Sequence, residues 1–462
     1  MSQSLIIPLL LVLAATGYWL GRQRALALRE ASVTGGALAT LPQYYGYYVA
    51  LLAALPAFVL FLAGVLFQGS IIDALLLGSL PAEMTTDISA AERNLLLSSI
   101  KNAAQGTTFG TPSPEILAAA ETLGTYRLIV RGAVFALVMA LAVAGLTWAR
   151  GQIAPSFRAR HRVEGIVFGL IVLASLVAII TTLGILVSLI YESWRFFERV
   201  PVTDFLFGLN WEPQIAIRPD QVASAGAFGA VPIFWGTIVV SICAMFVAVP
   251  IGLMAAIYTA EYATQPVRAT IKPILEVLAG IPTIVYGFFA VITVSPFLRG
   301  IAAALGIEMA PTAAIVAGGV MGIMLIPFIS SFADDALNSV PQSLRDGSAA
   351  LGATKSETIR QVLLPAALPG IMGGVLLALS RAIGETMIVV MAAGLTANLT
   401  LNPLEGVTTT TVQIVTLLIG DTEFDSPKTL AAFGLGLVLF LSTLVLNVLA
   451  LGIVKKYREQ YD

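Results

Sequence analysis

Nine apolar stretches constrain this chain more than any other feature of its sequence. A helix needs roughly 20 predominantly apolar residues to cross the hydrocarbon core of a bilayer. The stretches approach or exceed that length, although the first and the sixth are short. They lie at about residues 4–20, 46–67, 127–148, 165–190, 233–258, 283–298, 311–332, 370–395 and 430–454. The sequence therefore predicts an all-α integral membrane protein, a polytopic helical bundle of about nine spans.

The composition supports this class and excludes others. Of the 462 residues, 58% are hydrophobic and 11% are charged, whereas soluble domains carry about 25% charged residues. The formal net charge of −2 argues against nucleic acid binding, which calls for a basic patch. Cys243 is the single cysteine, so no internal disulfide can form. His161 is the single histidine, and no cysteine near it could share a metal ion.

The distribution of Lys and Arg predicts the orientation, because short cytoplasmic loops carry an excess of both residues. The first basic residues follow the first apolar run, which favours an anchor helix with an external N-terminus over a secretory signal. The external segments then hold 8 of the 25 Lys and Arg. The cytoplasmic segments hold 15, at residues 21–45, 149–164, 259–282, 333–369 and 455–462. We therefore expect an external N-terminus and a cytoplasmic C-terminus.

Two external segments are long enough to carry structure of their own. Residues 68–126 predict short helices near Ser89–Ala104 and Pro114–Leu123, each with a capping residue and an acidic first turn. Residues 191–232 are rich in Trp and Phe, which is typical of a belt at headgroup depth. A platform for an external partner is the alternative interpretation of these aromatic residues.

One cytoplasmic segment, residues 259–282, contains two prolines that are expected to interrupt it. Pro266 and Pro273 predict a set of short interfacial helices rather than one continuous helix. Glu261 is expected to be solvated in the loop that precedes them.

The eighth span carries the most costly side chains of the chain. Arg381 and Glu385 lie near its midpoint, where an ionised group costs about 2.5–3.5 kcal/mol. Because they are four residues apart, they are expected to share a helix face and to pair. One interpretation is a structural ion pair that sets helix register. We favour a substrate pathway, in which Arg381 offers its planar donors to a phosphate-like oxyanion and Glu385 is the resting counter-charge.

A polar segment, Asp346–Pro365, lies between two very apolar spans. It is rich in small side chains near Gly352, which allow another surface to approach the backbone closely. On the cytoplasmic side of a membrane protein, such a segment is typical of a docking element. The chain has no phosphate-binding G-x-x-x-x-G-K-[ST] loop, so a cycle driven by ATP would need a separate ATPase.

This polar segment resembles the cytoplasmic coupling loop of the permeases of ABC importers. The pattern in that family is Glu-Ala-Ala, three residues, Gly, nine residues, Ile, one residue and Leu-Pro. Its positions are occupied here by Asp346, Gly347, Ser348, Gly352, Val362, Leu364 and Pro365. The opening triplet and the isoleucine depart from the pattern, whereas the glycine, the Leu-Pro pair and the spacing match. The resemblance implies that these residues couple the chain to an ATPase.

Further stretches, among them EVLAGIPTIVYGFFAV and SRAIGETM, resemble the PstC family of phosphate importer permeases over about residues 165–460. The resemblance implies a type I, MetI-like permease core and a role for Arg381 and Glu385 in phosphate passage. It also implies a second permease like PstA, two ATPase copies like PstB, and a periplasmic phosphate-binding protein like PstS. This chain would bind no cofactor, and the partner ATPase would use ATP and Mg²⁺.

The expected domains follow from this resemblance. Residues 165–462 are expected to form the permease core, with the coupling loop at 334–369. Residues 1–164 are expected to form an extension with three added spans and the external segment 68–126. The expected function is the permease subunit of an ATP-driven phosphate importer in the bacterial inner membrane. The alternatives are an importer of molybdate, sulfate or a phosphonate, and a secondary transporter or channel that works alone.

Overall fold

The computed structural model describes residues 5–31, 38–81, 89–107, 113–213, 226–419 and 425–458. The chain divides into two compact units, Met1–Ile180 and Thr181–Asp462, and each is described by itself. Helix α6 (Ala159–Phe197) crosses from one unit into the other. The expected domain boundary at residue 164 lies inside this helix, and the functional division of the chain stays a prediction.

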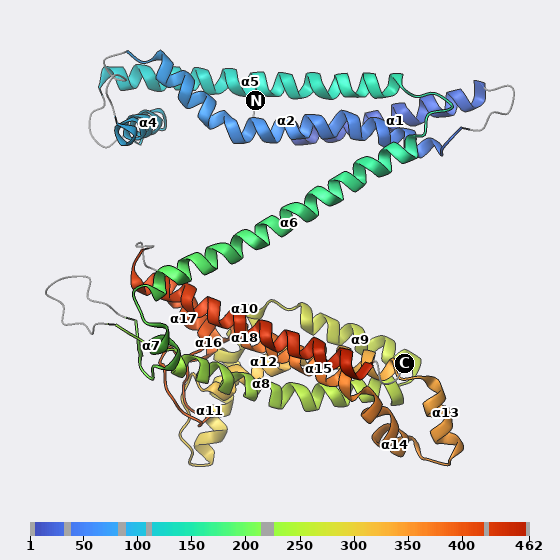
Figure 1. Cartoon of the computed structure of the whole chain (residues 1–462), viewed down its shortest axis with the longest axis vertical. Helices are drawn as coiled ribbons and strands as arrows, with labels where there is room; N and C mark the ends of the chain where they lie inside the picture. The colour runs from blue at the N-terminus through green and yellow to red at the C-terminus, as the bar shows by residue number, and fades with distance from the viewer. Residues whose placement is uncertain are drawn as a thin grey trace. The chain divides into compact units, whose positions relative to one another are not determined.

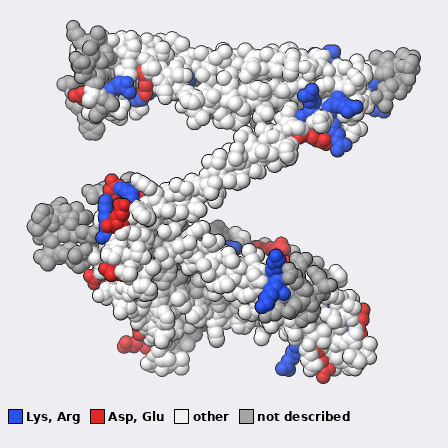
Figure 2. Space-filling view, in the orientation of Figure 1, with Lys and Arg blue, Asp and Glu red and all other residues white. Residues whose placement is uncertain are grey.

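The described residues contain nine helices that are long and apolar enough to cross a membrane, which confirms the expected number. Their ranges are Ile6–Glu30, Pro42–Ser79, Pro114–Gly151, Ala159–Phe197, Val231–Tyr262, Thr283–Ala304, Ala314–Asn338, Lys355–Ile383 and Pro427–Lys456. Charged side chains gather near the ends of these helices and leave their long flanks bare in Figure 2. The chain is therefore a multi-pass membrane protein.

The first unit is built on three long helices that run side by side, α1 (Ile6–Ala31), α2 (Pro42–Ser79) and α5 (Pro114–Gly151) (Figure 1). Two buried tyrosines of α2 join it to the connection between α5 and α6. The hydroxyl of Tyr45 donates to the carbonyl of Phe157 at 2.9 Å, and that of Tyr48 donates to Gln152 Oε1 at 2.8 Å. Gly145 lets α5 lie directly on the carbonyl of Leu52.

One of the two short helices expected in residues 68–126 is confirmed and the other is not. Helix α4 (Ala90–Ala104) starts at Ser89, which forms a capping box with Glu92. The hydrogen bonds from Ser89 lower the pKa of the Glu92 carboxyl. Residues 114–123, by contrast, belong to the long helix α5. Ser113 caps its start and Pro114 occupies the first helical position, but nothing between these residues and the span breaks the helix.

Helices α8 (Val231–Ile257) and α12 (Ala314–Asn338) form the core of the second unit. Small residues let their backbones approach, as is usual for helices packed in a membrane. A Cβ on Gly318 would collide with Cys243, and one on Gly322 would lie 2.7 Å from the carbonyl oxygen of Ala244. Helix α12 contributes more buried residues to this core than any other element, and it is enclosed by its neighbours.

The remaining elements of the second unit pack around this pair. They are α7 (Val202–Phe207), β1 (Trp211–Glu212), β2 (Ala227–Phe228), η2 (Tyr258–Tyr262), α9 (Gln265–Gly280), α10 (Thr283–Phe289), η3 (Ala290–Val294), α11 (Ser295–Ala304), α13 (Gln342–Ala350), α14 (Lys355–Thr358), η4 (Ile359–Leu363), α15 (Leu364–Ile383), α16 (Met387–Ala392), α17 (Thr410–Leu418) and α18 (Pro427–Arg458). The two strands pair antiparallel, with Trp211 opposite Phe228.

The aromatic residues near α7 form a packed cluster in addition to any surface belt. Phe196, Phe205, Trp211 and Phe228 are buried, and their rings meet edge to face. The expectation of a simple belt was therefore wrong for these four, because edge-to-face stacking and apolar burial stabilise a small core. Trp194, which stays exposed, fits the expectation better.

The two ends of the second unit carry different features. Helices α13 and α14 and the C-terminal end of the chain lie at one end, and α7 and α11 lie at the other (Figure 1). At the α7 end, Arg195 of α6 donates to the carboxylate of Asp425 at 2.7 Å. This hydrogen bond lowers the pKa of the Asp425 carboxyl.

Helix α9 differs from the expected set of short pieces. It runs unbroken from Gln265 to Gly280. Pro266 lies at the start of the helix, where its missing N–H costs nothing, and Pro273 is accommodated inside. The two prolines therefore do not divide the segment.

Candidate functional site

The helix that carries Arg381 ends earlier than expected. Helix α15 stops at Ile383, and Gly384 caps it. Glu385 lies beyond the helix, so it does not share a face with Arg381, and none of the ion pairs among the described residues joins them. The predicted pairing was wrong because glycine is a poor helix former and a common helix terminator.

The break divides the eighth span into α15 and the short helix α16. Hydrogen bonds satisfy two of the backbone groups at the break, as non-helical backbone in a membrane protein requires. The hydroxyl of Thr411 donates to the carbonyl of Glu385 at 2.8 Å, and the N–H of Met387 donates to Glu385 Oε1 at 3.2 Å. Broken helices supported in this way are typical of substrate sites in transporters.

Arg381 faces a polar cavity in the second unit. Its guanidinium carbon lies 5.6 Å from the ring centroid of Phe328 on α12, within cation–π range. The cavity has a volume of about 270 Å³. Its polar lining residues are Thr259, Lys272, Glu276, Ser330, Ser331, Asp334 and Arg381. The predicted arginine is therefore brought together with one other cation, two carboxylates and three hydroxyls, while Glu385 is not among the lining residues.

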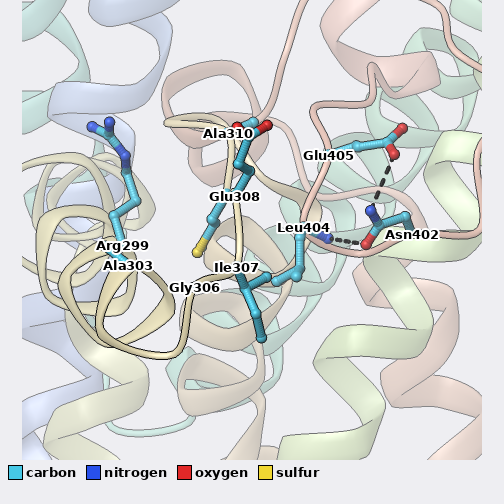
Figure 3. A pocket seen from close by; sticks show the side chains of 10 residues that line it. Arg299, Ala303, Gly306, Ile307, Glu308, Ala310, Asn402, Leu404 and Glu405 are labelled. Carbon is cyan, nitrogen blue, oxygen red and sulfur yellow. Dashed lines mark hydrogen bonds between the residues drawn. The ribbon is translucent and has the colours of Figure 1, made fainter.

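A larger cavity, of about 820 Å³, lies beside the end of α11 and the loop before α17 (Figure 3). Its charged lining residues are Arg299, Glu308 and Glu405, and Asn402 donates to Glu405 at 3.1 Å. Carboxylates outnumber the arginine there, which makes it a poor site for an oxyanion. Neither predicted pathway residue lines it.

The predicted coupling residues begin on α13. Asp346 accepts a hydrogen bond from Gln342 at 3.2 Å. A side chain at Gly347 would enter open space, with no other atom within 4 Å of its Cβ. Ser348 is buried, and its hydroxyl lies 2.8 Å from that of Thr358. Ser348 therefore joins α13 to the start of the following helix and plays a structural part.

Gly352 ends α13 in a left-handed conformation, with φ of +83°. The N–H of Ala353 donates to the carbonyl of Ser348, and that of Gly352 donates to Ala349, which is the Schellman arrangement. This conformation is a reason for glycine here that is independent of any partner. The residue before it, Leu351, is 92% exposed at the tip of the loop.

The Leu364-Pro365 pair does not interrupt the helix. The chain is helical from Lys355 to Ile383, with a π-helical turn, η4, just before Leu364. A π-turn shifts the hydrogen-bonding pattern and accommodates the missing N–H of the proline. One continuous helical segment thus connects the predicted coupling loop to Arg381.

Arg345 is a site residue that the sequence did not reveal. Its guanidinium lies 3.0 Å from Glu261 Oε1 and donates to the carbonyls of Leu337 and Val340 at 2.8 Å each. Glu261, expected to be solvated, is largely buried in this ion pair. The pair ties α13 to η2, the turn that continues α8. The partners are 84 residues apart, so no local spacing rule could have matched them.

A helical membrane protein with a broken span beside a polar cavity, and a polar loop at one end, has the design of a transport permease. Residues 248–459 match a family described as the binding-protein-dependent transport system inner membrane component. Residues 7–181 match a family described as a phosphate ATP-binding cassette transporter. The expected fold class, an ABC importer permease core, is therefore confirmed, and the expected bounds of that core stay a prediction.

Proteins of similar sequence indicate which group of transport permeases the chain belongs to. A probable ABC transporter permease of Bacillus subtilis, YqgH, is 35% identical over 282 residues, which cover 61% of this chain and 85% of that protein. The phosphate transport system permease protein PstC of Mesorhizobium japonicum is 31% identical, covering 60% of this chain and 85% of that protein. PstC of Haemophilus influenzae is 30% identical, covering 62% and 91%. The chain belongs to the PstC family of phosphate transport permeases.

Proposed function

We propose that this chain is the permease subunit of an ATP-driven importer of inorganic phosphate. Its membership of the PstC family carries the proposal, because the named members of that family are phosphate transport permeases. The partners would be a second permease like PstA, an ATPase dimer like PstB and a phosphate-binding protein like PstS. This chain would bind no cofactor, and the ATPase would use ATP and Mg²⁺.

The proposed location is the bacterial inner membrane, with the N-terminus external and the C-terminus cytoplasmic. The excess of Lys and Arg in the segments assigned to the cytoplasm supports this orientation. The proximity of α13 and α14 to the C-terminal end of the chain is consistent with it (Figure 1).

The proposed mechanism is alternating access. Closure of the ATPase would move α13, and two contacts would pass that motion on. The Arg345–Glu261 pair, at 3.0 Å, leads to α8, and the Ser348–Thr358 contact, at 2.8 Å, leads to the helical segment that carries Arg381. Motion at the loop would then open and close the path at the arginine.

The proposed pathway residues are Arg381 and Glu385, with altered roles. Arg381 would contact the anion directly, since the described carboxylates leave it without an ion pair. Glu385 would not be its resting counter-charge. Its side chain instead accepts a hydrogen bond from the N–H of Met387, and this bond would stabilise the helix break beside the pathway.

Uptake competition tests the substrate. We expect membrane vesicles that hold the assembled importer to take up radioactive phosphate, and unlabelled phosphate to compete far better than sulfate, molybdate or a phosphonate at equal concentration. Vesicles without this chain are the control. Stronger competition by one of the other oxyanions would favour an importer of that anion and overturn the phosphate assignment.

A further inference from the structure

Asp334, a buried carboxylate, lines the same cavity as Arg381 and contacts helix α9. Asp334 of α12 is 1% exposed. Arg268 Nη2 lies 3.1 and 3.0 Å from its two carboxylate oxygens, and Lys272 Nζ lies 2.7 Å from Oδ2. One carboxylate therefore holds two cations of α9 in place.

The charged residues of α9 recur every fourth position. Arg268, Lys272 and Glu276 thus share one helix face, and Arg268 and Lys272 contact Asp334. No residue of α9 is itself buried. Apolar packing alone would hold this helix weakly, so the ion pairs to Asp334 fix its position against α12.

Lys272 and Arg268 differ in whether they line the cavity. Lys272 lines the cavity together with Arg381, and its side chain remains 42% exposed. An ammonium group has three donors, so its contact with Asp334 leaves donors for a ligand. Arg268 makes the same kind of contact with Asp334 but is not among the lining residues.

We propose that Lys272 is a second anion-contacting residue, an inner station to which the oxyanion passes from Arg381, and that Asp334 is its positioning residue. This inference rests on the proposed function. The two stations meet α12 at Phe328 and Asp334, six residues or about 9 Å apart along the helix. The Asp334 carboxylate competes with the anion for Lys272 and so promotes its release, as successive sites in a pathway require.

The test compares Lys272→Gln with Arg268→Gln in the complete importer, reconstituted with its second permease, ATPase and binding protein. Both variants remove one partner of Asp334, but only the first removes a cation from the cavity. We expect the maximal rate of phosphate uptake per assembled complex to fall about tenfold in Lys272→Gln, the loss of a charged hydrogen bond. Arg268→Gln should stay within about twofold, and Lys272→Arg should recover most of the rate.

Equal losses in Lys272→Gln and Arg268→Gln would assign Lys272 a purely structural role and overturn the inference, as would normal uptake in Lys272→Gln. If the unaltered importer takes up no phosphate, the proposed function itself fails. If the unaltered importer takes up phosphate and the two variants lose uptake equally, only the assignment of Lys272 as an anion-contacting residue fails.

Protection of a cysteine gives a readout that does not depend on turnover. In a Cys243→Ser background, Ala279→Cys places a thiol at the cavity wall. We expect inorganic phosphate to slow its labelling by an anionic thiol reagent, and the added change Lys272→Gln to remove most of that protection. Undiminished protection without Lys272 would contradict the proposal.

Discussion

Replacing Arg381 with alanine is expected to lower phosphate uptake by about tenfold to a hundredfold while the importer still assembles. The guanidinium faces a polar cavity over Phe328 and makes no ion pair with the described carboxylates. Its removal therefore leaves no buried charge without a partner, and assembly should survive. Hydrogen bonds to charged groups contribute about 1.5–3 kcal/mol each, which sets the size of the effect.

The measurement is radioactive phosphate uptake per assembled complex, with the ATPase content determined in the same sample. Arg299→Ala is the matched control, because Arg299 lines a different and acidic cavity (Figure 3). It should transport at close to the unaltered rate. Normal uptake by Arg381→Ala would remove Arg381 from the substrate pathway.

Replacing Leu351 with aspartate is expected to release the ATPase. Leu351 is 92% exposed at the tip of the loop, although the surrounding segment is too polar to lie in lipid. Burying a leucine in a partner surface contributes about 1.5–3 kcal/mol, and a buried carboxylate there would add a penalty. Retention of the ATPase on the tagged chain should fall at least about tenfold, and phosphate uptake should fall with it.

The chain offers a close control for this experiment. Leu305 also follows a helix and precedes a left-handed glycine, Gly306, and it is 69% exposed. It lies at the α11 end of the unit rather than at the coupling loop (Figure 1). Leu305→Asp should leave ATPase retention unchanged. If both variants kept the ATPase, or both lost it, Leu351 would not be a specific docking residue.

Gly352 is less suitable for such a test. Its φ of +83° strains any residue with a side chain by roughly 1–2 kcal/mol, whether or not a partner docks. A defect in Gly352→Ala would therefore combine loop strain with loss of docking. A change at Leu351, which the sequence pattern did not single out, tests docking without adding this backbone strain.

The spans could be predicted from the sequence because membrane insertion depends on local apolar length. Within the part of the chain that the structure describes, nine helices of suitable length overlap the expected spans, although the eighth ends 12 residues earlier than expected. The pattern around Asp346 also lies within one short segment, and the coupling role that it indicates stays a prediction. These features require only nearby residues.

The features that sequence reasoning missed depend on contacts between distant segments. The helix break after Ile383 is supported by Thr411, 26 residues beyond Glu385. Asp334 meets Arg268 across 66 residues. Gly384 is a local signal for the helix break, whereas the cavity could not be inferred without the distant residues that line it.

The most direct test of the central claim is ATP-driven phosphate uptake into proteoliposomes that contain this chain with its partner permease and ATPase. The phosphate-binding protein is added on the side of α7 and α11, and ATP on the side of α13. We expect uptake that requires both additions and stops when ATP is replaced by a non-hydrolysable analogue. Phosphate uptake by this chain alone, without ATP or the binding protein, would contradict the account.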